Sequence, residues 1–275
     1  DYVQGIHFNP DGTKMYTLYG LNSTKVFQYN LNEPWNPDSG TAVNFKFANT
    51  VVSESMTNFW FKPDGTKFYA LGARINEWNM SESWNVASAS LGSNVTININ
   101  GAGTIGKTAS QGVWTWNPDG TKFYVLDVSA SVNGNYGKLQ EYRLSTPWDI
   151  TTTSWGANGP NVNFFSTRNT PITQSYSTNM FWHPNGKTLY VFFDRPYSNF
   201  SKFNFSESWN VLTFTSWSNN YASIRNEIAL GSGTTDLSGF YVRPDGKIFY
   251  MTAQRPSSII TVSKLTLPPI LNLSK

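Results

Sequence analysis

One short phrase occurs five times in this chain and limits the possible folds more than any other feature. Each copy has an aromatic stretch, then Pro-Asp-Gly or Pro-Asn-Gly, then a basic residue and further apolar residues. The copies stand at His7–Leu18, Trp60–Leu71, Thr115–Leu126, Phe181–Phe192 and Tyr241–Thr252. Their prolines (Pro10, Pro63, Pro118, Pro184 and Pro244) follow one another at steps of 53, 55, 66 and 60 residues. A repeat of this length indicates one supersecondary unit that is used several times.

Each copy predicts a β-hairpin. The arms are rich in aromatic and β-branched residues, which suit a pleated, half-buried surface. Between them, proline presets φ, Asp bonds its own backbone and Gly accepts a positive φ, so the phrase is a strong turn signal. The fourth copy has Asn185 in place of Asp. Because Asn turns equally well, the carboxylate is not required at this position.

A second landmark follows each hairpin, namely a strand that ends in a tryptophan. It occurs at Val26–Trp35, Ile75–Trp84, Leu139–Trp148 and Phe200–Trp209, and the fifth copy has Pro269 at the tryptophan position. Polar and apolar residues alternate along this segment, as they do in a half-buried strand. In copies three and four a Thr-Ser-Trp follows, ending at Trp155 and Trp217, and it predicts a fourth, outer strand.

These units predict an all-β fold, a five-bladed β-propeller of four-stranded antiparallel blades that occupies residues 1–275 as a single domain. Radial arrangement protects sheet edges, which are otherwise open to pairing. The phrases resemble the blades of YVTN and WD-repeat propellers, a resemblance that implies the fold and leaves function open. The outer strand of the last blade has three possible explanations. Residues 269–275 supply a short strand, the blade has three strands, or the chain is part of a longer protein.

The composition narrows the range of partners. Charged residues make up 13% of the chain and aromatic residues 16%, so Asn, Ser, Thr and Gly must cover much of the surface, as in extracellular, virion and sugar-binding proteins. The formal net charge is +3 without a basic run, which argues against a nucleic-acid partner. There is no apolar run long enough to span a membrane. The chain has no cysteine, and no cofactor is expected.

The four landmark tryptophans, Trp35, Trp84, Trp148 and Trp209, are the candidate ligand-binding residues. A sugar ring stacks well on an exposed aromatic face, and repeated blades can present repeated sites. Alternatively, each indole fills the space between neighbouring blades as an aromatic core residue. The loss of the tryptophan in the last copy favours packing, since terminal repeats often depart from the pattern.

Catalytic and metal-binding roles receive less support from the sequence. The aspartates of the repeated phrase (Asp11, Asp64, Asp119 and Asp245) are expected to cap their own turns, and a radial fold holds such turns apart from one another. The two histidines, His7 and His183, are too few for a zinc site without carboxylates. We therefore expect neither a metal site nor catalytic residues.

We expect a non-catalytic binding or structural module outside a cell, at a cell surface or on a virion, as in phage tail fibres. Its partner would be a glycan or a protein surface, and it would form a homo-oligomer or assemble with other structural chains. The alternative is a propeller hydrolase, a glycosidase or lactonase, with acidic residues in a central pocket.

Overall fold

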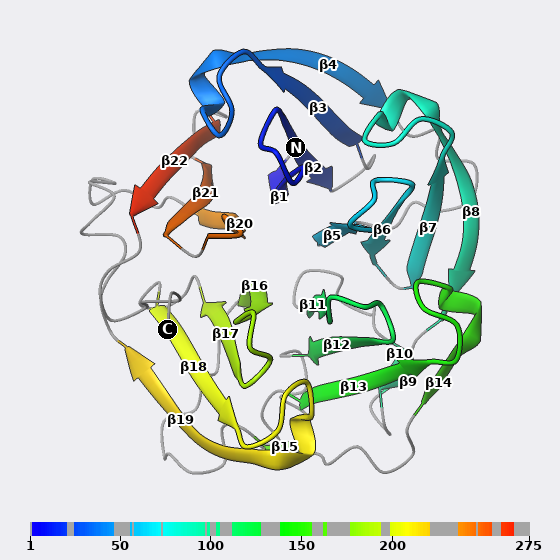
Figure 1. Ribbon diagram of the computed structural model, residues 1–275, viewed down its shortest axis with the longest axis vertical. Helices are drawn as coiled ribbons and strands as arrows, with labels where there is room; N and C mark the ends of the chain where they lie inside the picture. Colours follow the sequence, from blue (N-terminus) through cyan, green and yellow to red (C-terminus); the bar gives the residue numbers. More distant parts are fainter. Residues whose placement is uncertain are drawn as a thin grey trace.

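In the computed structural model, the described residues form five antiparallel sheets of three or more strands around a common axis (Figure 1). The structure describes residues 2–20, 25–46, 56, 58–72, 74–96, 98–99, 103–104, 112–127, 138–155, 162–163, 177–193, 199–220, 236–245, 247–254 and 260–266. Each sheet is one blade, and its first strand lies next to the axis, with the later strands progressively further out. The molecule is therefore an all-β propeller, as the repeat predicts.

The strands of the first two blades follow the chain from the axis outward. Blade one contains β1 (Tyr2–Phe8), β2 (Lys14–Gly20), β3 (Lys25–Leu31) and β4 (Gly40–Lys46). Blade two contains β5 (Asn58–Phe61), β6 (Lys67–Leu71), β7 (Ile75–Met80) and β8 (Ala89–Val95). A short hairpin of β9 (Asn98–Ile99) and β10 (Gly103–Thr104) follows blade two.

The remaining blades repeat this order with small departures. Blade three has β11 (Gly112–Trp116), β12 (Lys122–Asp127) and β13 (Lys138–Leu144), and β13 pairs with both β14 (Thr153–Trp155) and β15 (Val162–Asn163). Blade four has β16 (Ser177–Trp182), β17 (Thr188–Phe193), β18 (Asn199–Phe205) and β19 (Phe214–Asn220). Blade five has β20 (Asp236–Val242), β21 (Ile248–Gln254) and β22 (Ile260–Thr266).

The outer strands confirm one sequence expectation and leave another open. Trp155 lies in β14 and Trp217 in β19, so the Thr-Ser-Trp segments do form fourth strands. Blade five has three strands among its described residues. The segment 269–275, one of the predicted sources of a fourth strand, lies outside the described residues.

A one-turn 3-10 helix joins the third and fourth strands in blades one to four. These turns are η1 (Pro37–Ser39), η2 (Val86–Ser88), η4 (Ile150–Thr152) and η5 (Val211–Thr213). An Asn or Asp before each turn caps it by accepting a backbone N–H, as Asn85 does from Ala87 at 3.1 Å. A Ser or Thr at the end of each 3-10 turn accepts the backbone N–H of the residue two positions before the landmark tryptophan, as Ser88 does from Glu82. Among the described residues no helix is long and apolar enough to cross a membrane.

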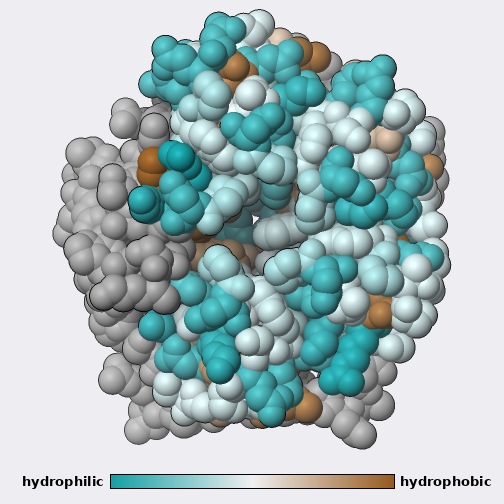
Figure 2. All heavy atoms as spheres, viewed as in Figure 1, coloured by the Kyte–Doolittle hydropathy of each residue, from teal (hydrophilic) through white to brown (hydrophobic). Residues whose placement is uncertain are grey.

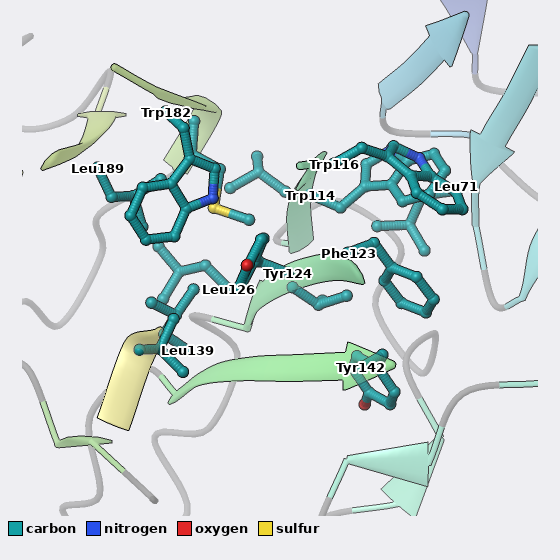
Figure 3. Packing of buried hydrophobic residues seen from close by; sticks show 14 of the residues in the cluster. Leu71, Trp114, Trp116, Phe123, Tyr124, Leu126, Leu139, Tyr142, Trp182 and Leu189 are labelled. Atoms are coloured by element: carbon teal, nitrogen blue, oxygen red, sulfur yellow. The ribbon is translucent and has the colours of Figure 1, made fainter. Parts of the chain in front are cut away.

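The core lies between the blades, where aromatic side chains of neighbouring sheets interlock. Figure 3 shows the interior around blade three, with Trp116 and Phe123 from that blade and Trp182 from blade four. The rings of Tyr124 and Trp182 meet edge to face at a centroid distance of 4.9 Å. Such contacts account for the high aromatic content of the chain.

Blade five closes the ring against blade one. The hydroxyl of Tyr250 in β21 donates to the carbonyl oxygen of Trp35 in blade one at 2.8 Å. A Cβ atom on Gly239 would lie 2.7 Å from backbone atoms of Gly5 and Ile6, so the inner strands of the two blades approach closely. Glycine at position 239 permits this approach because it has no side chain.

Candidate functional site

The landmark tryptophans lie between the end of each third strand and the 3-10 turn that follows it, a segment that we call the corner of the blade. Trp35, Trp84, Trp148 and Trp209 have φ angles of 63°, 62°, 62° and 58°. A positive φ is a strained conformation for a bulky side chain. In blades one to four the backbone N–H of the tryptophan donates to the carbonyl oxygen of the turn glycine, at 2.9 Å from Trp84 to Gly65. This bond fastens the corner to the hairpin turn of the same blade.

The indole rings lie flat on these turn glycines. A Cβ atom on Gly12 would come within 2.2 Å of the Trp35 ring, and one on Gly120 within 2.2 Å of the Trp148 ring. Both glycines also have a positive φ, 73° and 72°. The Pro-Asp-Gly glycine therefore has two roles, since it turns the chain and leaves room for the indole.

The tryptophan carbonyl oxygens connect neighbouring blades. A tyrosine hydroxyl of the preceding blade donates to each one: Tyr16 to Trp84 at 2.7 Å, Tyr69 to Trp148 at 2.6 Å, Tyr124 to Trp209 at 2.8 Å and Tyr250 to Trp35 at 2.8 Å. A lysine is a second donor at two of these seams, from Lys14 to Trp84 at 3.1 Å and from Lys122 to Trp209 at 2.9 Å. We call each such bond a seam bond.

The structure thus gives every landmark tryptophan a packing role. Trp148 is 9% exposed, and the other three are partly exposed. Their rings also contact aromatic neighbours, as Trp84 does with Phe61 at a centroid distance of 5.3 Å. Glycan stacking on Trp35, Trp84, Trp148 and Trp209 stays a prediction, and these contacts with glycine and aromatic rings compete with it.

The turn aspartates bond within their own hairpins. Asp11 Oδ1 accepts the Thr13 N–H at 2.9 Å and the Thr13 hydroxyl at 2.6 Å, and Asn185 Oδ1 accepts the Lys187 N–H at 2.8 Å. The Thr13 hydroxyl lowers the pKa of the Asp11 carboxyl. Within the described part of the chain, no three His, Asp or Glu side chains are grouped to hold a metal ion.

The innermost strands bring a different set of side chains to the axis. Counting three residues back from each anchor proline gives one position per blade, which we call the axial tier. Its members are His7, Trp60, Thr115, Phe181 and Tyr241. Trp60, Phe181 and Tyr241 are partly exposed although their strands are innermost. These three rings also pack on the core between the blades. Trp60 lies against the cluster around blade three, Tyr241 against the cluster between blades five and one, and Phe181 stacks on Phe240 of blade five at a centroid distance of 5.4 Å. Figure 2 shows a hollow at the centre of the face in view.

His7 is enclosed by aromatic rings of the neighbouring blades. Its imidazole lies 5.5 Å from the Trp60 ring and 4.9 Å from the Tyr241 ring, both edge to face, and 5.2 Å from the Phe61 ring. Burial lowers the pKa of His7 to about 3, so the imidazole is neutral at physiological pH. His183, in contrast, belongs to a turn, where its Nδ1 accepts the Asn185 N–H at 3.1 Å.

Two asparagines meet at the axis further along the inner strands. Asn58 and Asn179 lie five residues before their anchor prolines, in blades two and four. The Asn58 amide donates to Asn179 Oδ1 at 3.2 Å, although blade three stands between their blades. The Asn179 amide in turn donates to the carbonyl oxygen of Phe240 in blade five. Both asparagines are buried, so this amide pair crosses the axis beyond the axial tier.

Charges beside the axial tier are paired. One residue before the anchor proline, Lys62 forms an ion pair with Asp64 at 2.7 Å and Arg243 one with Asp245 at 3.2 Å. Arg243 also lies over the Trp35 ring, with its guanidinium carbon 5.4 Å from the ring centroid. These cations therefore have partners within their own turns.

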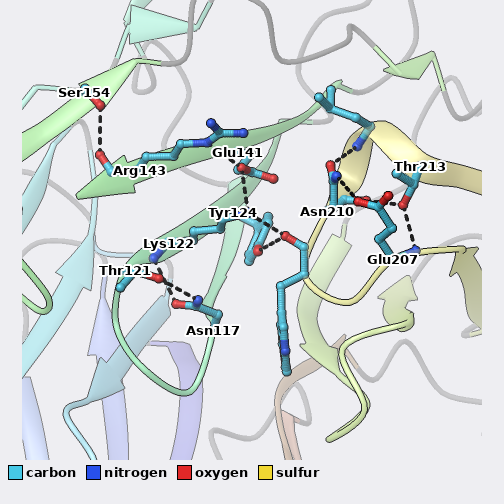
Figure 4. A network of polar contacts seen from close by, with 12 residues as sticks. Asn117, Thr121, Lys122, Tyr124, Glu141, Arg143, Ser154, Glu207, Asn210 and Thr213 are labelled. Atoms are coloured by element: carbon cyan, nitrogen blue, oxygen red, sulfur yellow. Dashed lines mark hydrogen bonds and ion pairs between the residues drawn. The ribbon is translucent and has the colours of Figure 1, made fainter. Parts of the chain in front are cut away.

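Buried carboxylates occur between the blades, away from the axis. Glu141 on β13 bonds Lys122 at 3.0 Å and Arg143 at 2.9 Å, and Lys122 also reaches the Trp209 carbonyl (Figure 4). Glu77 on β7 pairs in the same way with Lys67 at 3.1 Å. These glutamates are opposite the seam tyrosines on the adjacent strand, at Tyr124 and Tyr69. Glu141 thus pairs with a seam lysine, and Glu77 pairs with the lysine at the equivalent position of blade two.

The axial tier was not predicted from the sequence as a site. Its residues belong to the repeated phrase, where an aromatic strand residue is most simply interpreted as core. The available signal was variation within the repeat. This position holds His, Trp, Thr, Phe and Tyr in the five copies, whereas the position after it is aromatic in four of them.

Among the comparisons with known proteins, the one with solved structures supports the fold. No protein-family model matches the chain, and none of the curated proteins matches it. The solved structures that resemble it include a candidate 6-phosphogluconolactonase from Bacteroides uniformis, with a TM-score of 0.51 and 12% identity over 97% of this chain and 68% of that one. A periplasmic gluconolactonase from Pseudomonas aeruginosa has a TM-score of 0.48 and 12% identity over 96% of this chain and 72% of that one. At such low identity the likeness shows a β-propeller fold and nothing finer.

Proposed function

We propose that this propeller is a non-catalytic binding module that engages a carbohydrate partner through its axis. The axial tier supports this proposal most directly. It contains three partly exposed rings, Trp60, Phe181 and Tyr241, on the innermost strands, and the bonded amides of Asn58 and Asn179 lie two residues before Trp60 and Phe181 on the same strands. Partly exposed aromatic rings offer apolar faces, and amides are hydrogen-bonding groups for hydroxyls. A sugar ring presents both kinds of surface.

The proposal moves the expected glycan site from the corner tryptophans to the axis. The corner indoles lie flat on turn glycines, which takes up one face of each ring, whereas the partly exposed rings of the axial tier contact only other side chains in the described structure. We further propose that the module is displayed outside a cell or on a virion. The low charged fraction of 13% is consistent with such a setting.

A glycan array probed with the purified chain tests the proposal, with the Trp60→Leu variant in parallel. We expect specific binding to a subset of glycans that Trp60→Leu weakens at a temperature at which circular dichroism shows the variant to be folded, because Trp60 also packs on the core. Failure of the parent chain to bind any glycan would contradict a carbohydrate-binding function.

A second candidate function is hydrolysis of a sugar lactone. The Bacteroides uniformis protein that shares the fold is a candidate 6-phosphogluconolactonase, and a lactone ring has the size and polarity of a sugar. The same axial hollow would then receive the substrate. The test is release of acid from gluconolactone and from 6-phosphogluconolactone, followed at constant pH. Turnover well above the uncatalysed rate, lost in Trp60→Leu, would favour this function over a binding module.

Assembly with other chains is a further part of the proposal. Leu91 on β8 and Leu212 in η5 are 50% and 47% exposed on the outer part of their blades. Exposed apolar side chains on outer strands suit contacts between copies or with other structural proteins. Light scattering on the parent chain and on Leu91→Asn would show whether such contacts form an oligomer.

A further inference from the structure

The axial tier and the amide pair together limit what the axis can bind. The tier contains no side chain that carries a charge at neutral pH, since His7 is neutral and the other members are Trp, Thr, Phe and Tyr. Tyr241 keeps its proton as well, because burial raises the pKa of its hydroxyl. A charged ligand group placed here would lose hydration without gaining an opposite charge.

The cations two residues beyond the tier in blades two and five, Lys62 and Arg243, do not remedy this. Lys62 and Arg243 are already paired with Asp64 and Asp245 in their own turns. A phosphate or carboxylate would have to compete with these aspartates for the cations. The chemistry around the hollow therefore favours a neutral ligand over an anionic one.

The geometry also limits how the ligand lies. The bond between Asn58 and Asn179 crosses the axis, and a further bond continues to Phe240 of blade five. A chain of sugars cannot run through the axis past these buried side chains. A ligand that enters past the axial tier must therefore end at the amide pair.

From these features we propose that the axis binds the terminal residue of a neutral glycan, inserted end-on, with one ligand for each propeller. The inference rests on the proposed binding function and names its ligand class. It differs from a multivalent lectin, in which each of the four tryptophan corners would hold one ligand. It also differs from recognition of a phosphorylated or acidic sugar.

Isothermal titration calorimetry with defined probes tests the inference. The probes are neutral oligosaccharides that share a terminal residue chosen from the array, their capped forms with that terminus blocked, and matched sugars bearing a 6-phosphate or a uronic acid. We expect a stoichiometry near one, loss of binding on capping, and weaker binding of the charged probes. The affinity for the neutral probe should change little between about 50 mM and about 500 mM salt, because no charge is involved.

Variants at the axis and at a corner locate the site. Trp60→Leu and Phe181→Leu should each lower the affinity for the neutral probe about tenfold or more, as expected for loss of a stacked ring. Trp60→Phe should retain most of the affinity. Trp84→Leu, a tryptophan at a corner, is the matched control and should leave the affinity unchanged if it folds. Near-ultraviolet circular dichroism reports whether each variant keeps its packing.

The outcomes separate failure of the inference from failure of the binding function. Tighter binding of the charged probes, a stoichiometry near four, or binding that depends on Trp84 and not on Trp60 and Phe181 would overturn the inference and leave the binding function intact. Binding that survives capping would overturn end-on insertion in the same way. Absence of binding to every glycan on the array would overturn both.

Discussion

The seam bonds lead to a prediction that compares equivalent tyrosines within one molecule. Replacing a seam tyrosine by phenylalanine removes one hydroxyl and leaves the ring in place. The tryptophan carbonyl then loses its donor, and its hydration cannot be fully restored because the seam is partly or fully buried. Leaving such a group unsatisfied costs about 1–3 kcal/mol, whereas a neutral hydrogen bond contributes about 0.5–1.5 kcal/mol net.

The seams differ in whether a second donor is present. At Trp84 the Lys14 ammonium also bonds the carbonyl, at 3.1 Å, and at Trp209 the Lys122 ammonium does so at 2.9 Å. At Trp148, Tyr69 is the donor that the described residues supply, at 2.6 Å. Tyr69→Phe should therefore destabilise the fold by about 2 kcal/mol and Tyr16→Phe and Tyr124→Phe by about 1 kcal/mol or less.

Urea unfolding of the parent chain and the three variants measures these differences from the transition midpoints and slopes. The order is more decisive than the absolute values, because the ring and the acceptor are matched. The Tyr69 bond is buried and the other two are partly buried, so burial and the missing lysine act in the same direction. Equal losses at all three seams would refute the reasoning that lysine substitutes for the missing hydroxyl. A larger loss in Tyr16→Phe than in Tyr69→Phe would refute it more strongly.

Four further predictions concern the turns, the seams and pH. Gly65→Ala should destabilise by about 2–4 kcal/mol in urea unfolding, because alanine resists the φ of 71° and its Cβ would lie 2.3 Å from the Trp84 ring. Asn185→Asp should change the stability by less than about 0.5 kcal/mol, since the other turns bond equally well through Asp; a loss above about 1 kcal/mol would contradict the equivalence of the turns. Because the pKa of Asp11 is lowered in the folded state, its carboxylate stabilises the fold above the unfolded pKa of about 4, and this stabilisation is lost as the pH falls below that value. The urea midpoint of Asp11→Asn should therefore change less with pH, between about pH 5 and about pH 2, than that of the parent chain. Burial raises the pKa of the seam tyrosines, so stability should hold below about pH 10 and fall above it, and an unchanged melting temperature at about pH 11 would contradict the neutral seam bonds.

The repeated phrase was sufficient to predict the blades because its information is local. Proline, Asp and Gly specify a turn within four residues, and the alternation in Val26–Leu31 specifies a strand. The positive φ of the corner tryptophans could not be predicted, because tryptophan rarely adopts it. For Trp84 it depends on Gly65 in the hairpin turn of the same blade and on Tyr16 of the preceding blade.

The axial features lay beyond sequence reasoning for a similar reason. Asn58 and Asn179 are separated by two blade repeats, and only ring closure brings their amides together. In the sequence, His7 is not distinguishable from an ordinary strand residue. Only the folded structure brings the rings of blades two and five around it. The landmark tryptophans were recognised because they recur, and recurrence selects residues that every blade needs. Residues that differ from blade to blade, as on the axis, escape such a search.

A crystal structure of the propeller with the best glycan from the array most directly tests the account. We predict electron density for one terminal sugar on the axis, in contact with Trp60 and Phe181 and ending at the amides of Asn58 and Asn179. Sugar density at Trp35, Trp84, Trp148 or Trp209, with an empty axis, would contradict the account and restore the corners as the binding sites.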